Sequence, residues 1–318
     1  MLSREFLHAG PLLRKIMDMN SSVLSTAHPA TCSCSAWRPT RRLFTGLLAV
    51  GASVGAAPAW ANLPECKRSG FTKAVPAGQV EDSATQQYRQ MLQQYSGKRA
   101  LAPMDHPQLK RLRYMADRMI PFTPQCNERA RDWKWEVNLI GSPEVNAFCM
   151  PGGKIAFYWG ILAKLQLTDD EAAAIMGHEM AHALLEHARE QMGKNFATQT
   201  GLRLGAALLG LGDVGDAAAR MGSQLLSLNY SRTDETEADG LGLIMSAQAG
   251  YDPRAGITLW EKMMKTSGGG GPPKLLSTHP ASADRIRDIE GRMPRVQPLF
   301  EAAAKPRERF GPPPVSKG

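Results

Sequence analysis

The chain has 318 residues, of which 43% are hydrophobic and 21% charged, which is ordinary for a globular protein and enough for one sizeable domain with extensions. The formal net charge is +8, but six basic and two acidic residues lie in 1–61, so the rest of the chain carries +4. This mild excess comes without a stripe of basic residues interleaved with aromatic ones, which argues against nucleic-acid binding.

The N-terminal region has the features of an export signal. Paired arginines precede an apolar run over 47–57, and Ala59-Trp60-Ala61 offers small residues at both cleavage positions. We predict a signal peptide over 1–61 with an extended n-region, resembling a twin-arginine signal, that is cleaved after Ala61 and directs the protein to the periplasm. An uncleaved membrane anchor, a mitochondrial leader and a start at Met19 remain alternatives.

The cysteines suggest one cross-link. Cys66, Cys126 and Cys149 follow the predicted cleavage site, an odd number that allows one disulfide and one free thiol in an oxidising compartment. Their pairing does not follow from the sequence. We interpret Cys149 as a small buried apolar residue, with a redox or metal role as the alternative.

The polar segment 62–80 is predicted to be a flexible arm, and apolar periodicity then predicts helices over about 83–95 and 107–120. Alternation of period two over 133–139 predicts a strand with one buried face. With two further strands, at 145–150 and 154–158, it would form a small antiparallel sheet. An extended peptide can add to the edge of such a sheet.

A helix from Thr168 to about Met192 carries the most informative motif, His178-Glu179-Met180-Ala181-His182. Two imidazoles four residues apart share a helix face and can bind one divalent cation. Glu179 follows the first histidine and can reach a water at that cation. His187 comes nine residues after His178, about 180° around the helix, so we predict a structural role for it away from the metal.

A third ligand is expected from a second helix, over about 231–249. Glu235 and Asp239 are four residues apart and share a face, so a carboxylate from Glu235 would complete a His, His, Glu site of the kind that catalytic zinc uses. Asp239 could accept a hydrogen bond from the outer nitrogen of a zinc histidine, with His178 the favoured partner. Glu237 is about 200° around from Glu235 and is the weaker candidate.

The remaining segments are predicted to be mostly helical. The Gly-, Ala- and Leu-rich stretch 195–229 suggests a helical hairpin with a break at Gly212-Asp213, packed inside the protein or, as a minority interpretation, touching a membrane. Helices are expected from Asp252 to about Lys265 and from about Ser282 to Arg292, around a loop at 268–273. Residues 294–318 are Pro-rich and charged, and we predict a disordered tail.

Three ordered segments give the chain a family resemblance: 146–153, the motif at 178–182, and 231–239. It resembles gluzincin metalloproteases of the HtpX/CAAX-prenyl-protease family, most closely the small soluble periplasmic members and their mitochondrial relatives, over about 80–292. The resemblance implies a mainly helical α+β, zincin-like domain over 81–293 with its sheet beside the metal helix. It also implies that Glu235 is the third zinc ligand.

The resemblance further implies that Asn146 and Ala147 position the substrate on a sheet edge, although Asn146 could instead only shape a turn. His279 would approach the metal as a removable fourth ligand. Arg232 and His279 are the candidates for stabilising the oxyanion, with Tyr230 a weaker one. Cys149 departs from the family pattern, in which an alanine-like residue is usual.

The sequence therefore predicts a zinc endopeptidase that binds one zinc ion per chain and cleaves unfolded or misassembled polypeptides in the cell envelope. The rival hypothesis is a periplasmic chaperone-like protein with a self-inhibited or structural metal site. Peripheral membrane contact is compatible with either, and the sequence does not fix the oligomeric state.

Overall fold

The computed structural model describes residues 66–208, 225, 228–266, 274–280 and 282–314. The predicted signal peptide, the break at Gly212-Asp213 and the loop at 268–273 lie outside these residues. The helices are α2 (Ala77–Gly97), α3 (Pro107–Met119), α4 (Trp159–Leu165), α5 (Asp169–Leu184), α6 (His187–Leu208), α7 (Arg232–Gln248), α8 (Ala255–Lys265), α9 (Lys274–Thr278) and α10 (Ala283–Ala302), with short 3-10 helices η2 (Gly70–Ala74), η3 (Ile120–Gln125) and η4 (Glu128–Arg131). Three strands, β1 (Glu136–Ile140), β2 (Ala147–Met150) and β3 (Lys154–Tyr158), complete the predicted mainly helical α+β fold, which is confirmed. Among the described helices, none combines the length and apolarity that crossing a bilayer requires.

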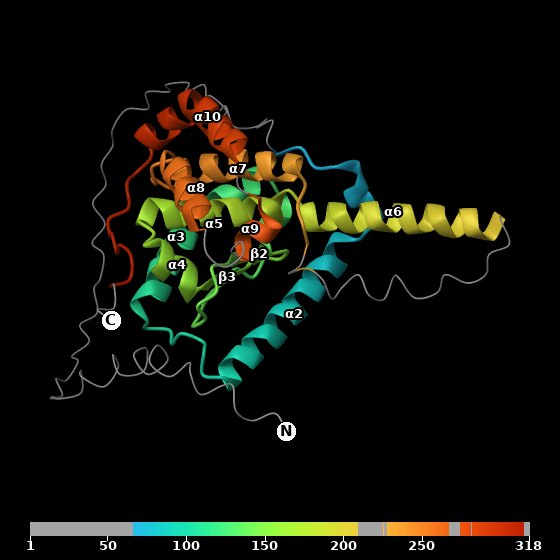
Figure 1. Cartoon of the computed structure of the whole chain (residues 1–318), viewed down its shortest axis with the longest axis horizontal. Coiled ribbons are helices and arrows are strands. Elements are labelled where there is room, and N and C mark those ends of the chain that lie inside the picture. The colour runs from blue at the N-terminus through green and yellow to red at the C-terminus, as the bar shows by residue number, and fades with distance from the viewer. Residues whose placement is uncertain (1–65, 209–224, 226–227, 267–273, 281, 315–318) are drawn as a thin grey trace, which may run out of the picture. The chain divides into compact units, whose positions relative to one another are not determined.

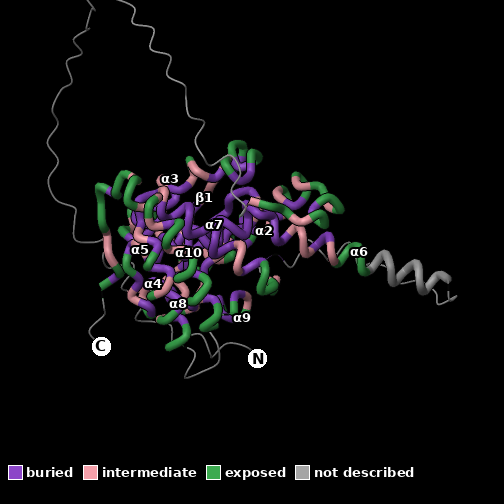
Figure 2. Tube along the Cα trace, turned by 90° about the horizontal axis from the view of Figure 1, so that it is seen from above, coloured by how far each residue is buried: buried purple, intermediate pink, exposed green. Residues whose placement is uncertain are grey.

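Helix α5 lies at the centre of this fold, and all but one of its residues are buried. It packs against α7 and α8 on one side and against β2 on the other (Figure 1), and buried residues run through α5 and α7 in the view of Figure 2. A Cβ atom added at Gly242 would lie 2.7 Å from the backbone nitrogen of His178, and one at Gly177 would lie 2.6 Å from the carbonyl oxygen of Gly242. Only glycine fits at these two positions, and the two helix backbones therefore pack closely.

The sheet is mixed rather than purely antiparallel. Its strand order is β1-β3-β2, with β3 antiparallel to β2 and parallel to β1. All five residues of β3 are buried, so this strand takes the centre and separates the other two. Alternation along the chain predicted the strands correctly but carries no information about their spatial order.

Helix α5 begins as predicted and ends early. The side chain of Thr168 accepts from the backbone N–H of Glu171, whose own side chain accepts from the N–H of Thr168, and together these two bonds form a capping box. The helix stops at Leu184 instead of near Met192, because Glu186 adopts a left-handed conformation with φ 61°. A second helix, α6, starts at His187 and includes the first part of the predicted hairpin.

The arm at 62–80 is not loose where the structure describes it. Cys66 forms a disulfide with Cys126, and of the three cysteines that the structure describes, Cys149 is the free, buried one. Helix η2 packs on α6, and the guanidinium of Arg189 donates a hydrogen bond to the carbonyl of Val75. The compositional prediction of a flexible arm was wrong for 66–80, because a cross-link and backbone contacts from distant segments hold it.

The predicted disordered tail is also wrong for 294–314. Helix α10 runs through Pro294 and Pro298 to Ala302. The chain then returns to the start of α5, where the backbone N–H groups of Phe310 and Gly311 donate to the carboxylate of Asp169 at 2.8 and 3.1 Å. The end of the chain thereby ties itself to the first turn of the central helix.

Asp169→Ala should lower the free energy of unfolding by about 3–5 kcal/mol, because it leaves the fully buried guanidinium of Arg111 without its carboxylate at 2.7 Å. Asp170→Ala is the matched control. Its carboxylate pairs with the half-exposed Arg309, so it should cost at most about 1 kcal/mol. Urea unfolding of both variants measures the difference, and equal losses would show that the buried pair is not what holds this end of α5.

Candidate metal centre

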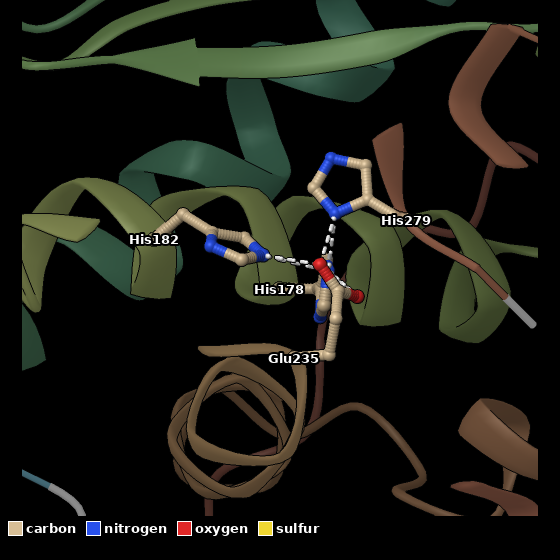
Figure 3. Close-up of side chains that lie close together, drawn as sticks. All are labelled: His178, His182, Glu235 and His279. Carbon is tan, nitrogen blue, oxygen red and sulfur yellow. Dashed lines mark hydrogen bonds and ion pairs between the residues drawn. The ribbon is translucent and has the colours of Figure 1, made fainter. Parts of the chain in front are cut away.

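Four buried side chains from three parts of the chain converge at the C-terminal half of α5 (Figure 3). His178 and His182 come from α5, Glu235 from the first turn of α7, and His279 from the residue after α9. One potential ligand atom from each lies within 4.8 Å of all the others. The two histidines and Glu235 are the set that the sequence predicted, and His279 joins them as the resemblance implied.

The ligand atoms face one another directly. Nε2 of His182 lies 3.1 Å from Nε2 of His178, and the two carboxylate oxygens of Glu235 lie 3.4 and 3.5 Å from these nitrogens. Nδ1 of His279 lies 2.8 Å from Oε1 of Glu235 and 3.3 Å from Nε2 of His178. Imidazole nitrogens and a carboxylate oxygen at such spacing form a ligand set that suits a divalent transition metal.

Helix α7 delivers Glu235 through its own N-terminal cap. Ser231 accepts a hydrogen bond from the backbone of Asp234, and the side chain of Asp234 accepts one from the backbone of Ser231. This second capping box fixes where the helix begins and therefore the face on which Glu235 lies. The glycine contact between α5 and α7 then brings that face against the histidines.

Glu179 supplies a further sign that the centre is built for an occupant. Its carboxylate is buried, and Oε1 has no hydrogen-bond partner within the described residues. Nε2 of His279, at 3.7 Å, forms a long ion-pair contact with it. Burial raises the pKa of Glu179, which suits a group that takes up a proton. A buried unpaired carboxylate oxygen is costly unless a water or a substrate group completes it.

Asp239 lies where the sequence placed it. Its Oδ1 is 3.0 Å from Nδ1 of His178, which leaves Nε2 of that histidine facing the cluster. Burial and the nearby Arg285 disfavour the protonated imidazole, but hydrogen bonds to Asp239 and Glu235 raise the pKa of His178 to about 9. Burial also raises the pKa of Glu235, but hydrogen bonds from His178, His182 and His279 outweigh it and leave this pKa low. Glu235 is therefore anionic, as a carboxylate ligand of a metal ion must be.

Arg285 belongs to the site and was missed from the sequence. It lies in the first turn of α10, stacks on Trp260 at 3.6 Å, donates to both oxygens of Asp239, and places Nη1 2.5 Å from Oε2 of Glu235. No local pattern pairs a residue at 285 with carboxylates some fifty residues earlier. Arg232, the guanidinium predicted from sequence, is exposed at the start of α7, apart from the buried cluster.

The predicted position of His187, away from the metal, is also wrong. Because the chain turns at Glu186, this imidazole lies beside the metal ligands instead of on the far side of a continuous helix, with Nδ1 2.8 Å from Nδ1 of His182. Its Nε2 is 3.3 Å from the carboxylate of Glu237. The ring of Tyr230 stacks on His182, with the ring centres 4.0 Å apart.

A cleft opens on the cluster along β2, with Asn146, Ala147, Glu179 and His279 in its lining. The carbonyl of Asn146 accepts from the N–H of Tyr158 in β3. Along a β-strand, the backbone N–H and C=O groups of successive residues point to opposite edges. Asn146 points its carbonyl at β3, so the N–H and C=O groups of Ala147 and Cys149 point to the edge of β2 that faces away from β3. The side chain of Asn146 bonds to Glu144 and to the N–H of Ala147, so it does shape this turn.

Comparisons of the sequence with known proteins find a matching family and several relatives. The family described as peptidase family M48 matches residues 108–293, more than half of the chain. The chain is 37% identical over 212 residues to mitochondrial metalloendopeptidase OMA1 of Schizosaccharomyces pombe, covering 66% of this chain and 60% of that protein. It is 40% identical over 157 residues to the OMA1 of Arabidopsis thaliana, covering 48% and 30%. It is 31% identical over 208 residues to metalloprotease LoiP of Escherichia coli, covering 64% and 78%.

Two substitutions in the first turn of α7 test the ligand set. Glu235→Ala removes the charged ligand and should reduce the bound metal from about one ion per chain to a small fraction after dialysis. Arg232→Ala, three residues earlier and exposed, should keep the wild-type metal content. Elemental analysis of the dialysed proteins measures both, and full metal content in Glu235→Ala would contradict the assignment.

Proposed function

Because the chain belongs to peptidase family M48, we propose that it is a zinc-dependent endopeptidase that cleaves unfolded or misassembled polypeptides in the cell envelope. The convergence of His178, His182 and Glu235 beside the buried carboxylate of Glu179 carries this proposal. A purely structural zinc site has no need of a neighbouring unpaired carboxylate.

We assign the metal to Nε2 of His178, Nε2 of His182 and the carboxylate of Glu235. When bound there, zinc would polarise the scissile carbonyl and lower the pKa of a water toward about 7. Glu179 would accept the proton of that water at Oε1, the atom without a hydrogen-bond partner in the described structure, and pass it to the leaving amine. Its raised pKa favours holding the proton between these two transfers.

Asp239 and Arg285 hold these ligands in place. Asp239 accepts from Nδ1 of His178, and Arg285 lies between Asp239 and Glu235. Arg285 neutralises part of the charge of two buried carboxylates that would otherwise repel each other. Arg232 is exposed and is not retained as an oxyanion donor. His279 keeps that candidate role, and Tyr230, whose ring stacks on His182, stays the weaker candidate.

His279 has two possible duties, and its position favours one. Nδ1 lies inside the ligand cluster, 2.8 Å from Glu235, where a fourth ligand would stand. Its backbone N–H is held at 2.7 Å by the carbonyl of Leu275 in the short helix α9. We infer that His279 closes the site in the resting protein and must move away before a substrate carbonyl can enter.

Substrate binding is assigned to the free edge of β2. The backbone groups of Ala147 and Cys149 face the cleft edge, and Glu179 and His279 line the same cleft. An extended segment paired there would be recognised through its backbone, and only an unfolded segment can offer that backbone. Asn146 orients the first of these groups through its bond to the N–H of Ala147.

The cross-link between Cys66 and Cys126 supports an exported protein, because disulfides persist in oxidising compartments such as the periplasm. A mitochondrial compartment is the alternative that the OMA1 relatives suggest. Sequencing the N-terminus of the protein from a periplasmic extract decides between them, with a start at Asn62 expected for cleavage after Ala61.

A second function is favoured by the same His279. A protein whose fourth ligand never leaves could hold extended clients on β2 without cutting them, as a chaperone-like binder. Casein cleavage with and without a chelator separates the two functions, because only the peptidase loses an activity when the metal is removed.

Glu179→Gln should keep about one zinc ion per chain while the cleavage rate of unfolded casein falls by at least about 100-fold, because the amide cannot accept the water's proton. Glu190→Gln, on the nearby α6, is the control and should retain wild-type activity. Cleavage by Glu179→Gln at the wild-type rate would rule out the mechanism.

His279→Ala should raise the basal cleavage rate if the imidazole closes the site. Removing it opens the fourth position and leaves the other three ligands in place. Initial rates on casein, with zinc content measured in parallel and His106→Ala as the histidine control, test this. A fall in the rate at full zinc content would instead assign His279 to the oxyanion.

A further inference from the structure

Two side chains outside the ligand cluster, His187 and Glu237, lead from His182 toward the surface. His187 is the first residue of α6 and is 2% exposed, whereas the side chain of Glu237 on α7 is 39% exposed. Nδ1 of His187 lies 2.8 Å from Nδ1 of His182, and its Nε2 lies 3.3 Å from Oε2 of Glu237. The three side chains thus form two hydrogen bonds in series that end at solvent.

The contact between the imidazoles allows one arrangement of protons when His182 binds a metal through Nε2. That nitrogen must present its lone pair, so the proton of the neutral ring is on Nδ1. This N–H donates to Nδ1 of His187, which must then accept. The proton of His187 is consequently on Nε2, from which it donates to Glu237. The direction of donation is that of a carboxylate–histidine–metal triad, with one imidazole inserted.

The backbone is bent to make this contact. Glu186 adopts φ 61°, a left-handed conformation that is unfavourable for a non-glycine residue because its Cβ crowds the following carbonyl oxygen. Its carboxylate is held by Arg189 at 2.5 Å and by Arg68 at 3.7 Å. Without this turn, a continuous helix would carry His187 to the side opposite the metal ligands. Strained backbone conformations of this kind are found most often at functional sites.

His178 and His182 then have matching support. Nδ1 of His178 faces the carboxylate of Asp239 directly, at 3.0 Å. Among the residues that the structure describes, no carboxylate pairs with Nδ1 of His182, which faces His187 instead. Tyr230 stacks on the ring of His182 and covers one face of it. Glu237 therefore stands at the end of the hydrogen bonds that orient His182, as Asp239 does for His178.

We propose that His187 is a positioning residue of the metal centre: it fixes the ring orientation and tautomer of His182 and is itself oriented by Glu237. This role rests on the proposed function, because it requires a metal at Nε2 of His182. It assigns a purpose to the left-handed residue between α5 and α6 and to the second glutamate of the 235–239 motif, neither of which the peptidase mechanism uses.

The test compares two variants of similar size in the full mature chain. His187→Leu removes the acceptor for Nδ1 of His182 and should raise the zinc dissociation constant about 10- to 100-fold. His187→Asn keeps an acceptor, Oδ1, near the position of Nδ1 and should restore most of that loss. Glu237→Gln, at the exposed end, should raise the constant only about two- to fivefold. His106→Leu is the control and should leave it unchanged.

Competition with a chromophoric chelator measures the dissociation constants, and thermal unfolding of the chelated proteins reports stability without metal. Equal loss of affinity in the Leu and Asn variants would assign His187 to packing and overturn the proposal. Unchanged zinc affinity in His187→Leu, with metal-dependent cleavage intact in the wild type, would overturn it while the proposed function stands. A wild-type chain that holds no metal would overturn both.

A second measurement needs no substitution at His187 and does not depend on whether the variants fold. In the zinc-loaded wild type, nitrogen-15 spectra of the histidine side chains should show protons on Nδ1 of His182 and on Nε2 of His187. A proton on Nδ1 of His187 would exclude it as an acceptor and overturn the proposal.

Discussion

The close approach of α5 and α7 is the constraint on which the site depends. Gly177 and Gly242 leave no room for a side chain between the two backbones, so Glu235, less than two turns before Gly242, reaches the nitrogen atoms of His178 and His182. A methyl group at either glycine would collide with backbone atoms of the other helix, which cannot yield as a flexible side chain does. Moving the helices apart would withdraw the carboxylate from both imidazoles at once, because one side chain serves both.

The buried charges of the site are stabilised because each carboxylate is paired with a cationic or hydrogen-bonding side chain. Glu235 and Asp239 are buried carboxylates on one face of α7, and each would be costly alone. Arg285 contacts both from α10, and the histidines of α5 supply the remaining partners. The guanidinium of Arg285 also lies over the ring of Trp260, 3.6 Å from its centre, and this contact attracts the cation to the ring face. Charge balance in the site therefore depends on a helix that contributes no predicted ligand.

The sequence could predict the relative positions of site residues that lie on the same helix, but not of those that distant segments bring together. His178, His182 and Glu179 are related by helix periodicity, and so are Glu235 and Asp239, which is why their faces could be assigned from spacing. His187 and Arg285 could not be placed. One depends on a single left-handed residue, Glu186, which no residue preference marks, and the other depends on tertiary packing. The order of the three strands and the return of the tail to Asp169 are likewise set by contacts between distant segments.

Both ends of α5 are held by segments far away in the chain, and this determines how rigidly the histidines are presented. At its start, Asp169 receives Arg111 and the backbone of the tail. At its end, the carbonyl of Leu184 accepts from the side chain of Asn127, the neighbour of the disulfide-bonded Cys126. These contacts oppose a rotation of α5 that would turn its histidines away from α7. The other side of the cluster is held by less, because His279 there follows the five-residue helix α9, and an opening of the site is easier on that side.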